Sequence, residues 1–311
     1  MKDNYGRDIY YLRLSVTERC NLRCLYCMPD DCTQKLESVM SADEIVEIAR
    51  AASNCGISKV RITGGEPLLR RDILEICERI ALLEDVTELC VTTNGILLTK
   101  FAEVLKSVGV NRLNISLDSL DTETYKKITR NGTLQGALDG LRKAIATGFD
   151  AIKINAVLLG GVNDSEVREL LELTRLYNIN VRFIELMPIG QTADWAHFVE
   201  AQTVLDMVPE LYDIGTDGVA KLYKLPGGQG TVGLISPISS HFCPTCNRIR
   251  ISADGKLKPC LHSAEEIELR GLSGEDLENA IRDAILGKPQ QHEIVHGEVS
   301  GSARDMNAIG G

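Results

Sequence analysis

The sequence has few aromatic residues, no long apolar run and no excess of positive charge. Aromatic side chains make up 5% of the 311 residues, which disfavours a surface that binds nucleic acid by base stacking. Lys and Arg number 34 against 44 Asp and Glu, a formal net charge of −10, which disfavours a broad nucleic-acid or membrane surface. No stretch reaches the roughly 18 apolar residues of a membrane span, and the opening MKDNYGRDIYYLRLSV is unlike a signal peptide. We therefore expect a cytoplasmic protein with no membrane or nucleic-acid partner.

Cysteine, in contrast, is plentiful, with ten in the chain. In a reducing compartment, cysteines serve more often as metal ligands or small buried residues than as disulfides. Cys77 and Cys90 lie within apolar runs, so we expect them in the core. Cys55 precedes the expected helix end at Gly56, and Cys32 has no evident role.

Short β-branched segments alternate with amphipathic segments between about residue 9 and residue 210. The expected strands cover 10–16, 59–63, 88–92, 112–118, 151–157 and 179–186, and the expected helices cover 41–56, 70–83, 98–109, 133–148 and 164–178. This alternating order predicts a parallel sheet with helices packed outside it. Six such units are too few for an eight-unit barrel, so we expect an α/β fold with a partial parallel (β/α)6 barrel.

The pattern changes after residue 215, where short β-rich segments are separated by Gly and Pro. These segments, at 221–225, 231–236, 248–252 and 256–260, are typical of hairpins. We therefore divide the chain into a partial barrel at 5–215 and a C-terminal α+β region at 216–311 that covers the open side of the barrel.

Three cysteines follow the first expected strand with the spacing C-x3-C-x2-C. This first trio is Cys20, Cys24 and Cys27, and the next cysteine, Cys32, lies outside this spacing. Three thiolates can hold three irons of a [4Fe–4S] cluster and leave the fourth iron open for a small molecule. The alternatives are a zinc knuckle with a ligand from elsewhere, or reactive thiols, although zinc sites usually use paired C-x2–4-C units.

A second trio, Cys243, Cys246 and Cys260, has the spacing C-x2-C-x13-C and is flanked by His241 and His262. Because three cysteines and one histidine are an ordinary zinc ligand set, the spacing alone leaves zinc and an iron–sulfur cluster both open.

Seven basic residues lie within expected strands, where charged side chains are unusual unless they are paired or functional. This basic set is Arg13, Lys59, Arg61, Lys153, Arg182, Arg248 and Arg250. Lys59 and Arg61, like Arg248 and Arg250, are two residues apart and share one face of a strand. Salt bridges with neighbouring acids could explain any one of these residues. Seven basic residues on strands that point to the same end of the expected barrel favour a binding pocket for an anion.

The first trio lies in the segment CNLRCLYC, which closely resembles the signature of the radical S-adenosylmethionine superfamily. The resemblance implies a [4Fe–4S] cluster whose open iron is chelated by S-adenosylmethionine. The cluster cleaves S-adenosylmethionine and so forms a 5′-deoxyadenosyl radical, which abstracts hydrogen. It places Tyr26 near the adenine and assigns Gly65 and Glu66 of the GGEP loop to the methionine amino group. Ser116 and Met187 match two further positions near this cofactor.

The segment HFCPTCNRIRISADGKLKPCLH resembles one branch, the GTP 3′,8-cyclase family that begins molybdenum cofactor biosynthesis. The resemblance implies a second [4Fe–4S] cluster on the second trio, with its open iron facing the guanine of GTP. All of the basic set matches basic positions of that family, and its GTP contacts fall on Arg13, Arg61, Thr92, Lys153, Arg248, Arg250 and the backbone of Ile249. The family also ends in a Gly-Gly pair whose tail enters the active site, here Gly310 and Gly311.

By this resemblance, C3′ of the ribose loses hydrogen and joins C8 of guanine, giving 3′,8-cyclo-7,8-dihydroguanosine triphosphate for a downstream pterin-forming enzyme. An electron donor such as flavodoxin or ferredoxin, and a monomer or homodimer, are expected. The segment 28–44 looks shorter than is usual in the family. Two alternatives remain: a radical enzyme that modifies peptides with an auxiliary cluster, and a non-enzymatic zinc-binding module.

Overall fold

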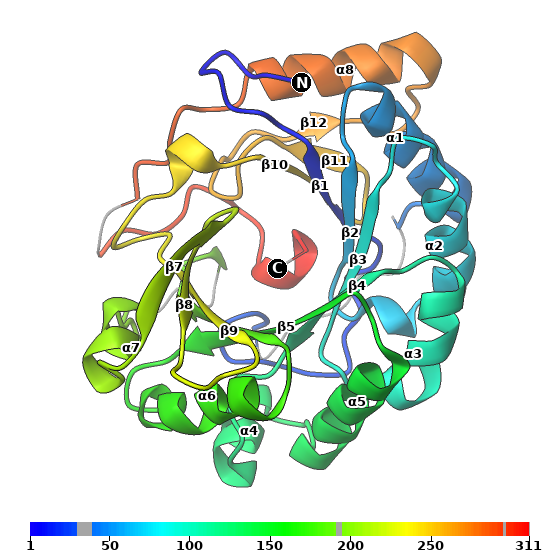
Figure 1. Ribbon diagram of the computed structural model, residues 1–311. Coiled ribbons are helices and arrows are strands. Elements are labelled where there is room, and N and C mark those ends of the chain that lie inside the picture. Colours follow the sequence, from blue (N-terminus) through cyan, green and yellow to red (C-terminus); the bar gives the residue numbers. More distant parts are fainter. Residues whose placement is uncertain (30–38, 191–194, 295–296, 311) are drawn as a thin grey trace.

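The computed structural model describes residues 1–29, 39–190, 195–294 and 297–310, so Cys32 and Gly311 lie outside the described residues. One curved sheet runs through the described chain and surrounds a central space (Figure 1). Its middle contains six strands paired in parallel in chain order: β1 (Tyr11–Ser15), β2 (Lys59–Thr63), β3 (Glu88–Thr93), β4 (Arg112–Ser116), β5 (Ala151–Leu158) and β6 (Asn180–Glu185). These are the six strands that the sequence predicted, and the α/β partial-barrel fold is confirmed.

The C-terminal segments extend this parallel sheet on both edges, which the hairpin interpretation did not anticipate. β9 (Thr231–Ile235) pairs in parallel with β6, and β10 (Arg248–Ile251) pairs in parallel with β1. Antiparallel strands then complete the edges: β8 (Ala220–Lys224) and β7 (Tyr212–Asp217) beyond β9, and β11 (Lys256–Lys258) and β12 (Ile267–Glu268) beyond β10. The segments at 231–236 and 248–252 are thus barrel strands, each with an antiparallel neighbour outside it.

The expected boundary at residue 215 falls inside β7, so the two parts of the chain share one sheet. β9 and β10 reach opposite edges of the six-stranded middle, and the C-terminal region therefore completes the wall of the barrel.

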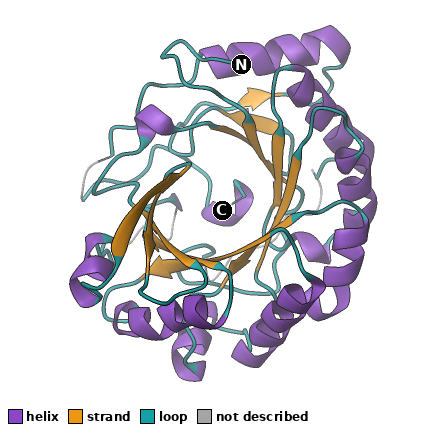
Figure 2. Cartoon of the chain, viewed as in Figure 1, coloured by secondary structure: helices purple, strands orange, loops and turns teal. Residues whose placement is uncertain are grey.

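Helices form the outer layer around the sheet (Figure 2). The five expected helices are present as α1 (Ala42–Asn54), α2 (Ile73–Ala81), α3 (Leu98–Ser107), α5 (Leu134–Thr147) and α6 (Val167–Leu176). Three more were not expected: α4 (Thr122–Thr129), α7 (Gln202–Met207) and α8 (Gly274–Leu286). A capping box starts α1, because the Ser41 hydroxyl accepts from the Glu44 N–H at 3.2 Å and the Glu44 carboxylate accepts from the Ser41 N–H at 2.7 Å.

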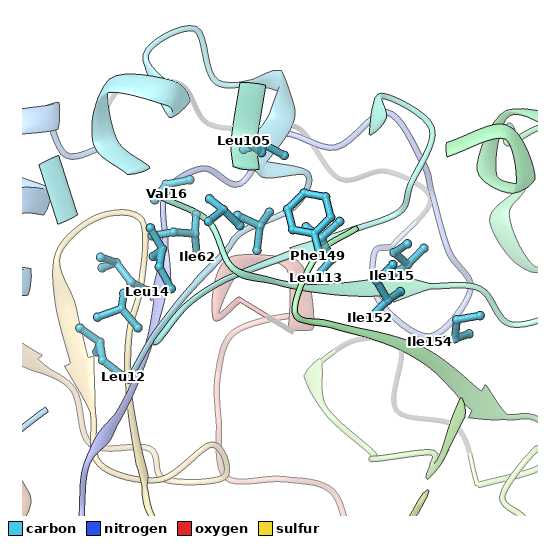
Figure 3. Close-up of a cluster of buried hydrophobic side chains, with 14 of the residues drawn as sticks. Leu12, Leu14, Val16, Ile62, Leu105, Leu113, Ile115, Phe149, Ile152 and Ile154 are labelled. Atoms are coloured by element: carbon cyan, nitrogen blue, oxygen red, sulfur yellow. The ribbon is translucent and has the colours of Figure 1, made fainter. Parts of the chain in front are cut away.

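The main core lies between the sheet and this helical layer. Leu12 and Leu14 of β1, Ile62 of β2 and Ile115 of β4 are among the side chains packed there (Figure 3). Because side chains alternate along a strand, the residues between them, such as Arg13 and Arg61, face the interior of the barrel. Cys77 and Cys90 are buried, as expected. Among the described residues, no helix combines the length and apolarity needed to cross a membrane.

Candidate active site

A cavity of ≈ 300 Å³ lies inside the barrel and brings together most of the residues selected from the sequence. It is lined by both cysteine trios and by the whole basic set, together with Tyr26, Gly65, Thr92, Ser116 and Met187. Of the selected residues that the structure describes, four are not among its lining: Glu66, His241, Ile249 and Gly310. Residues from opposite ends of the chain therefore share one chamber.

The loop with the first trio is held by backbone hydrogen bonds to the end of α4. The Arg23 N–H donates to the Thr129 carbonyl at 3.1 Å, and the Leu25 N–H donates to the Ile128 carbonyl at 3.0 Å. Burial raises the pKa of Cys20 to about 11 and raises that of Cys24 as well. The charges of Arg23 and Arg130 oppose these shifts but do not overcome burial.

The GGEP loop lies against the segment before Cys20. The Gly65 N–H donates to the Thr17 carbonyl and the Glu66 N–H to the Arg19 carbonyl, both at 2.7 Å. A Cβ on Gly65 would lie 2.4 Å from the Arg19 carbonyl oxygen, so this contact requires glycine.

Glu66 also has a structural role that the sequence did not indicate. Its fully buried carboxylate accepts from the Leu68 N–H at 3.1 Å, the Thr93 hydroxyl at 2.8 Å and the Asn94 N–H at 2.8 Å. These bonds join the end of β2 to the end of β3. The predicted contact of Glu66 with a cofactor amino group stays a prediction, while Gly64 and Gly65 line the cavity beside it.

Tyr26 is oriented by an acid that the sequence analysis did not single out. Its hydroxyl donates to the Asp118 carboxylate at 2.8 Å, and the same carboxylate accepts from the Val157 N–H at 2.8 Å. Burial raises the pKa of Asp118 to about 6. Asp118 lies two residues after Ser116 in NISLD and also lines the cavity.

The second trio is assembled from two separate segments. Cys243 and Cys246 lie at the short 3-10 turn η4 (Cys243–Thr245), and Cys260 follows β11. Arg7 donates to the Cys243 carbonyl at 3.0 Å, and the Lys288 ammonium donates to the Pro259 carbonyl at 2.5 Å. These bonds connect the second trio to the N-terminus and to the segment after α8.

Cations distinguish this second trio from the first. Although burial opposes the shift, the charges of Lys288 and Arg248 lower the pKa of Cys246 below its ordinary value of 9.0. Burial raises the pKa of Cys243 in the second trio as it raises that of Cys20 and Cys24 in the first, so the lowered pKa of Cys246 is the difference between them.

Three histidines crowd beside the second trio. The rings of His241 and His292 stack with centroids 4.4 Å apart, and the centroids of His262 and His292 are 4.6 Å apart. Over the described part of the chain, only His241, Cys243 and His292 bring three His, Cys or acidic ligand atoms within 4.8 Å of one another. This group contains His241, one of the two histidines selected from the sequence, together with His292, which was not selected, and it does not contain His262.

Five residues of the basic set form two rows across the inner face of the sheet. Arg13 of β1 lies in register with Arg61 of β2 and with Arg250 of β10. In the next row, Tyr11 lies between Lys59 and Arg248. The Tyr11 ring contacts the charged ends of Lys59, Arg61 and Arg248, at 5.1–5.4 Å from its centroid.

Burial and this crowding of like charges lower the pKa values of several cations. Burial, followed by the charges of Arg250, Arg61 and Arg248, lowers the pKa of Arg13 well below its ordinary value. Burial also lowers the pKa of Arg250 and Arg182 to about 10 and that of Lys153 to about 8. An anionic ligand would relieve this repulsion.

Several polar atoms in the cavity wall are buried without a hydrogen-bond partner among the described residues. They are the Tyr11 hydroxyl, Arg61 Nε, the Thr92 hydroxyl, the Asn155 amide oxygen and Arg248 Nε. Buried polar atoms in folded proteins are normally satisfied, so this set fits a polar ligand. Tyr11 and Asn155 were missed in the sequence, although alternation from Arg13 and Lys153 would have placed both on the inner face.

Comparisons with known proteins agree with this site. Residues 14–174 match the model of the Radical SAM superfamily, and residues 179–294 match that of Molybdenum Cofactor Synthesis C. The chain is 45% identical over 320 residues to the GTP 3′,8-cyclase of Alkaliphilus oremlandii and 44% identical to that of Alkaliphilus metalliredigens, with each chain covered in full. The GTP 3′,8-cyclase of Peptoclostridium acidaminophilum is 45% identical, covering 99% of this chain and 98% of that one.

This chain belongs to the GTP 3′,8-cyclase family. It is therefore a radical S-adenosylmethionine enzyme, and membership of that superfamily implies a [4Fe–4S] cluster and S-adenosylmethionine. Among solved structures, Streptococcus suis SuiB has a TM-score of 0.65 at 15% identity, covering 91% of this chain and 67% of that one. An identity this low shows the shared fold alone.

In this member of the GTP 3′,8-cyclase family, the C-terminal tail lies inside the ring of strands (Figure 1). Met306 and Ile309 form a buried cluster with Ile189, against which Cys27 of the first trio and Leu261 beside the second trio pack. The Gly310 carbonyl accepts from Arg250 at 3.0 Å. Gly310 has φ +70°, and a Cβ there would lie 2.2 Å from the Thr63 hydroxyl, so the close approach requires glycine.

Proposed function

We propose that this chain converts GTP to 3′,8-cyclo-7,8-dihydroguanosine triphosphate at this cavity, the first step of molybdenum cofactor biosynthesis. The observation that carries the proposal is the single chamber lined by two cysteine trios and seven cations. When bound, the first cluster and S-adenosylmethionine supply a 5′-deoxyadenosyl radical that removes hydrogen from C3′ of the ribose, after which C3′ joins C8 of guanine.

At one end of the cavity, the chain positions the radical source. Cys20, Cys24 and Cys27 would hold the first cluster on a loop fixed by α4. Tyr26, held by Asp118, presents its ring to the adenine, and Ser116 and Met187 complete the lining of this end. Gly65 and Glu66 would meet the methionine amino group, with the Glu66 carboxylate held by Leu68, Thr93 and Asn94.

At the other end, the second trio would hold a second [4Fe–4S] cluster whose open iron meets the guanine. Cys243, Cys246 and Cys260 line the cavity, and Lys288 and Arg248 favour the thiolate form of Cys246. The donor set suits the cluster because three thiolates leave one iron open to the substrate.

Between these ends, the basic set would bind the triphosphate. Arg13, Arg61 and Arg250 form one row, and Arg61 and Arg248 have buried Nε atoms without partners among the described residues. Charge-assisted hydrogen bonds to phosphate would satisfy them, with Thr92 as a further donor. Lys59 already pairs with Glu88, so it contributes charge at the edge of this pocket, and Ile249 would contribute its backbone alone.

The tail would close the chamber and exclude water from the radical steps. Met306 lines the cavity, and Gly310 binds Arg250. We also propose that a small electron carrier such as flavodoxin or ferredoxin reduces the first cluster, that the enzyme works in the cytoplasm, and that a downstream enzyme forms the pterin.

The decisive experiment reconstitutes the protein without air and counts its iron. The protein is then incubated with S-adenosylmethionine, a reductant and GTP. We expect about eight irons per chain, as two [4Fe–4S] clusters require, and formation of 5′-deoxyadenosine together with the cyclised nucleotide. 5′-Deoxyadenosine without GTP consumption would contradict the proposal and favour a peptide-modifying enzyme. A colourless protein with one zinc would contradict both.

A further inference from the structure

Asp217 occupies a position in the cavity where a substrate phosphate is expected. It is the last residue of β7, the outermost strand at that edge of the sheet, and its side chain lines the cavity. One carboxylate oxygen, Oδ2, accepts from both the Lys153 ammonium and Arg182 Nη2. Both donors belong to the basic set and come from neighbouring strands, β5 and β6.

The exposure of the three side chains differs. Lys153 and Arg182 are 10% and 8% exposed, whereas Asp217 is 48% exposed. The two cations are therefore fixed in the wall, and the acid reaches them from the solvent side. Although burial opposes it, the ion pairs with Lys153 and Arg182 lower the pKa of Asp217 to about 2, so the carboxylate is charged at neutral pH.

Other acids of the described chain do not play this part. Glu88 pairs with Lys59 but is not among the residues that line the cavity. Asp118 lines the cavity, but its carboxylate accepts from Tyr26 and Val157. Glu185 also lines it, but its carboxylate accepts from the backbone N–H groups of Ala201, Ile238 and Ser239. Of the acids in the described residues, Asp217 alone both lines the cavity and forms a salt bridge with the basic set.

The strand that carries Asp217 lies at the edge of the sheet and contributes no buried residue to the core. Every residue of β7 is exposed, and within the described chain β7 pairs with β8 alone, with an irregular register between Asp213 and Gly215. Gly218 follows Asp217 with φ +62°, and no atom of the described residues would lie within 4 Å of a Cβ added to it. A change of direction at this turn is therefore sterically inexpensive.

We propose that Asp217 is an internal counter-ion that holds Lys153 and Arg182 in place until a phosphate group of the substrate displaces it. A phosphate oxygen can accept from both cations as Oδ2 does, and it carries more charge. A ligand without a phosphate at this point gains nothing by displacing the carboxylate. Asp217 would thus select for highly charged nucleotides and place one substrate phosphate against Lys153 and Arg182. This inference rests on the proposed function for the identity of the nucleotide.

The test measures equilibrium binding to reconstituted holoprotein without reductant, so that no turnover occurs. Three ligands are compared: GTP, inorganic tripolyphosphate and guanosine. Asp217→Asn removes the charge and keeps the size of the side chain. Asp213→Asn is the matched control, since Asp213 lies on the same strand, and its hydrogen bond from the Gly215 N–H can be kept by the amide oxygen. Iron content and thermal unfolding confirm that both variants are folded and loaded.

We expect Asp217→Asn to bind GTP and tripolyphosphate about three- to tenfold more tightly than the unchanged protein, as loss of a competing ion pair predicts. Guanosine binding should change by less than about twofold, and Asp213→Asn should behave like the unchanged protein. Equal or weaker tripolyphosphate binding by Asp217→Asn, or an equal gain for guanosine, would overturn the inference. If the unchanged protein binds no GTP while Asp217→Asn still gains affinity for tripolyphosphate, the cyclase proposal fails and the counter-ion stands.

Discussion

The two cysteine trios line one cavity but are built in different ways. Cys20, Cys24 and Cys27 lie on a single loop after β1, and that loop is fixed by backbone bonds to α4. Cys243 and Cys246 lie before β10, whereas Cys260 follows β11, so the second trio forms only when this hairpin has folded. The first trio is local in the sequence, and the second depends on tertiary structure.

Their electrostatic surroundings differ at one thiol. Burial raises the pKa of Cys20 to about 11 and also raises that of Cys243, whereas Lys288 and Arg248 lower that of Cys246 against the effect of burial. The basic set lies beside the second trio through Arg248 and Arg250 of β10. The comparison suggests that the first end of the cavity is built for a buried cofactor and the second for an anionic substrate.

The largest effect should come from removing one cysteine of each trio. Cys24→Ala should lower the iron content by about half and abolish both 5′-deoxyadenosine and the cyclised nucleotide. Cys260→Ala should lower the iron by the same amount, but retain the first cluster and some 5′-deoxyadenosine formation without cyclised product. Iron counting and chromatography of both products separate the variants. Identical losses of 5′-deoxyadenosine in the two variants would contradict the assignment of radical formation to the first trio and of substrate cyclisation to the second.

The tail links the two trios, and its substitution should have the next largest effect. Gly310→Ala places a Cβ 2.2 Å from the Thr63 hydroxyl at φ +70°, so we expect a cost of roughly 1–3 kcal/mol for docking the tail. The expected result is slower cyclisation with both clusters retained, measured as product formed per 5′-deoxyadenosine.

Gly297→Ala is the control for this change. Gly297 has φ +95°, but no atom of the described residues would lie within 4 Å of its added Cβ, so it tests the backbone effect without the steric clash. Equal activity of the two variants would contradict a specific role for the Gly310 contact.

The sequence predicted the local parts of this arrangement better than the long-range ones. The alternation of apolar and polar residues identified β1 to β6, because each inward-facing Arg or Lys lies between buried neighbours such as Leu12 and Leu14. The same alternation could not show that β9 and β10 pair with β6 and β1, since pairing partners are not encoded by local pattern. The row formed by Arg13, Arg61 and Arg250 follows from that pairing.

Contacts between residues far apart in the sequence were the ones missed. Asp217 lies 64 residues from Lys153 and 35 from Arg182, and nothing around it in the sequence marks the contact. Glu66 was selected for a cofactor contact, which stays a prediction, and its bonds to Thr93 and Asn94, 27 and 28 residues away, were not foreseen. His292 was not selected, and it lies beside His241 and Cys243 because the chain returns there after α8.

Zinc offers a sharper test of how the trios differ. Reconstitution with added zinc should reduce iron at the second trio, where His241, Cys243 and His292 converge, and leave the first trio loaded. Burial and His241 lower the pKa of His292, which keeps its ring neutral and able to bind the ion.

His292→Ala should remove this sensitivity to zinc. His197→Ala should leave it unchanged, since the His197 ring contacts the Gly160 carbonyl and does not line the cavity. Zinc and iron are counted in the same samples, and equal loss of iron from both trios would contradict the expected difference.

The smallest effect should come from Arg304, which fixes the tail to the hairpin of the second trio. Its guanidinium donates to Asp254 and Glu266, on either side of β11, at 2.6–2.9 Å. Although burial opposes it, Arg304 lowers the pKa of both carboxyls below their ordinary values of 3.8 and 4.5. Carboxyls with lowered pKa stabilise the fold above those ordinary values, and this contribution is lost as pH falls through the lowered ones.

Arg304→Met should therefore cost roughly 2 kcal/mol near neutral pH, from lost hydrogen bonds between charged groups, and the difference from the unchanged protein should shrink as the pH falls below about 4.5. Denaturant unfolding at several pH values measures this. Arg282→Met, which removes the pair with Glu278 on α8, should show a smaller difference because that pair is more exposed. An equal loss of stability in Arg282→Met, or a difference for Arg304→Met that does not shrink at low pH, would contradict this role of Arg304.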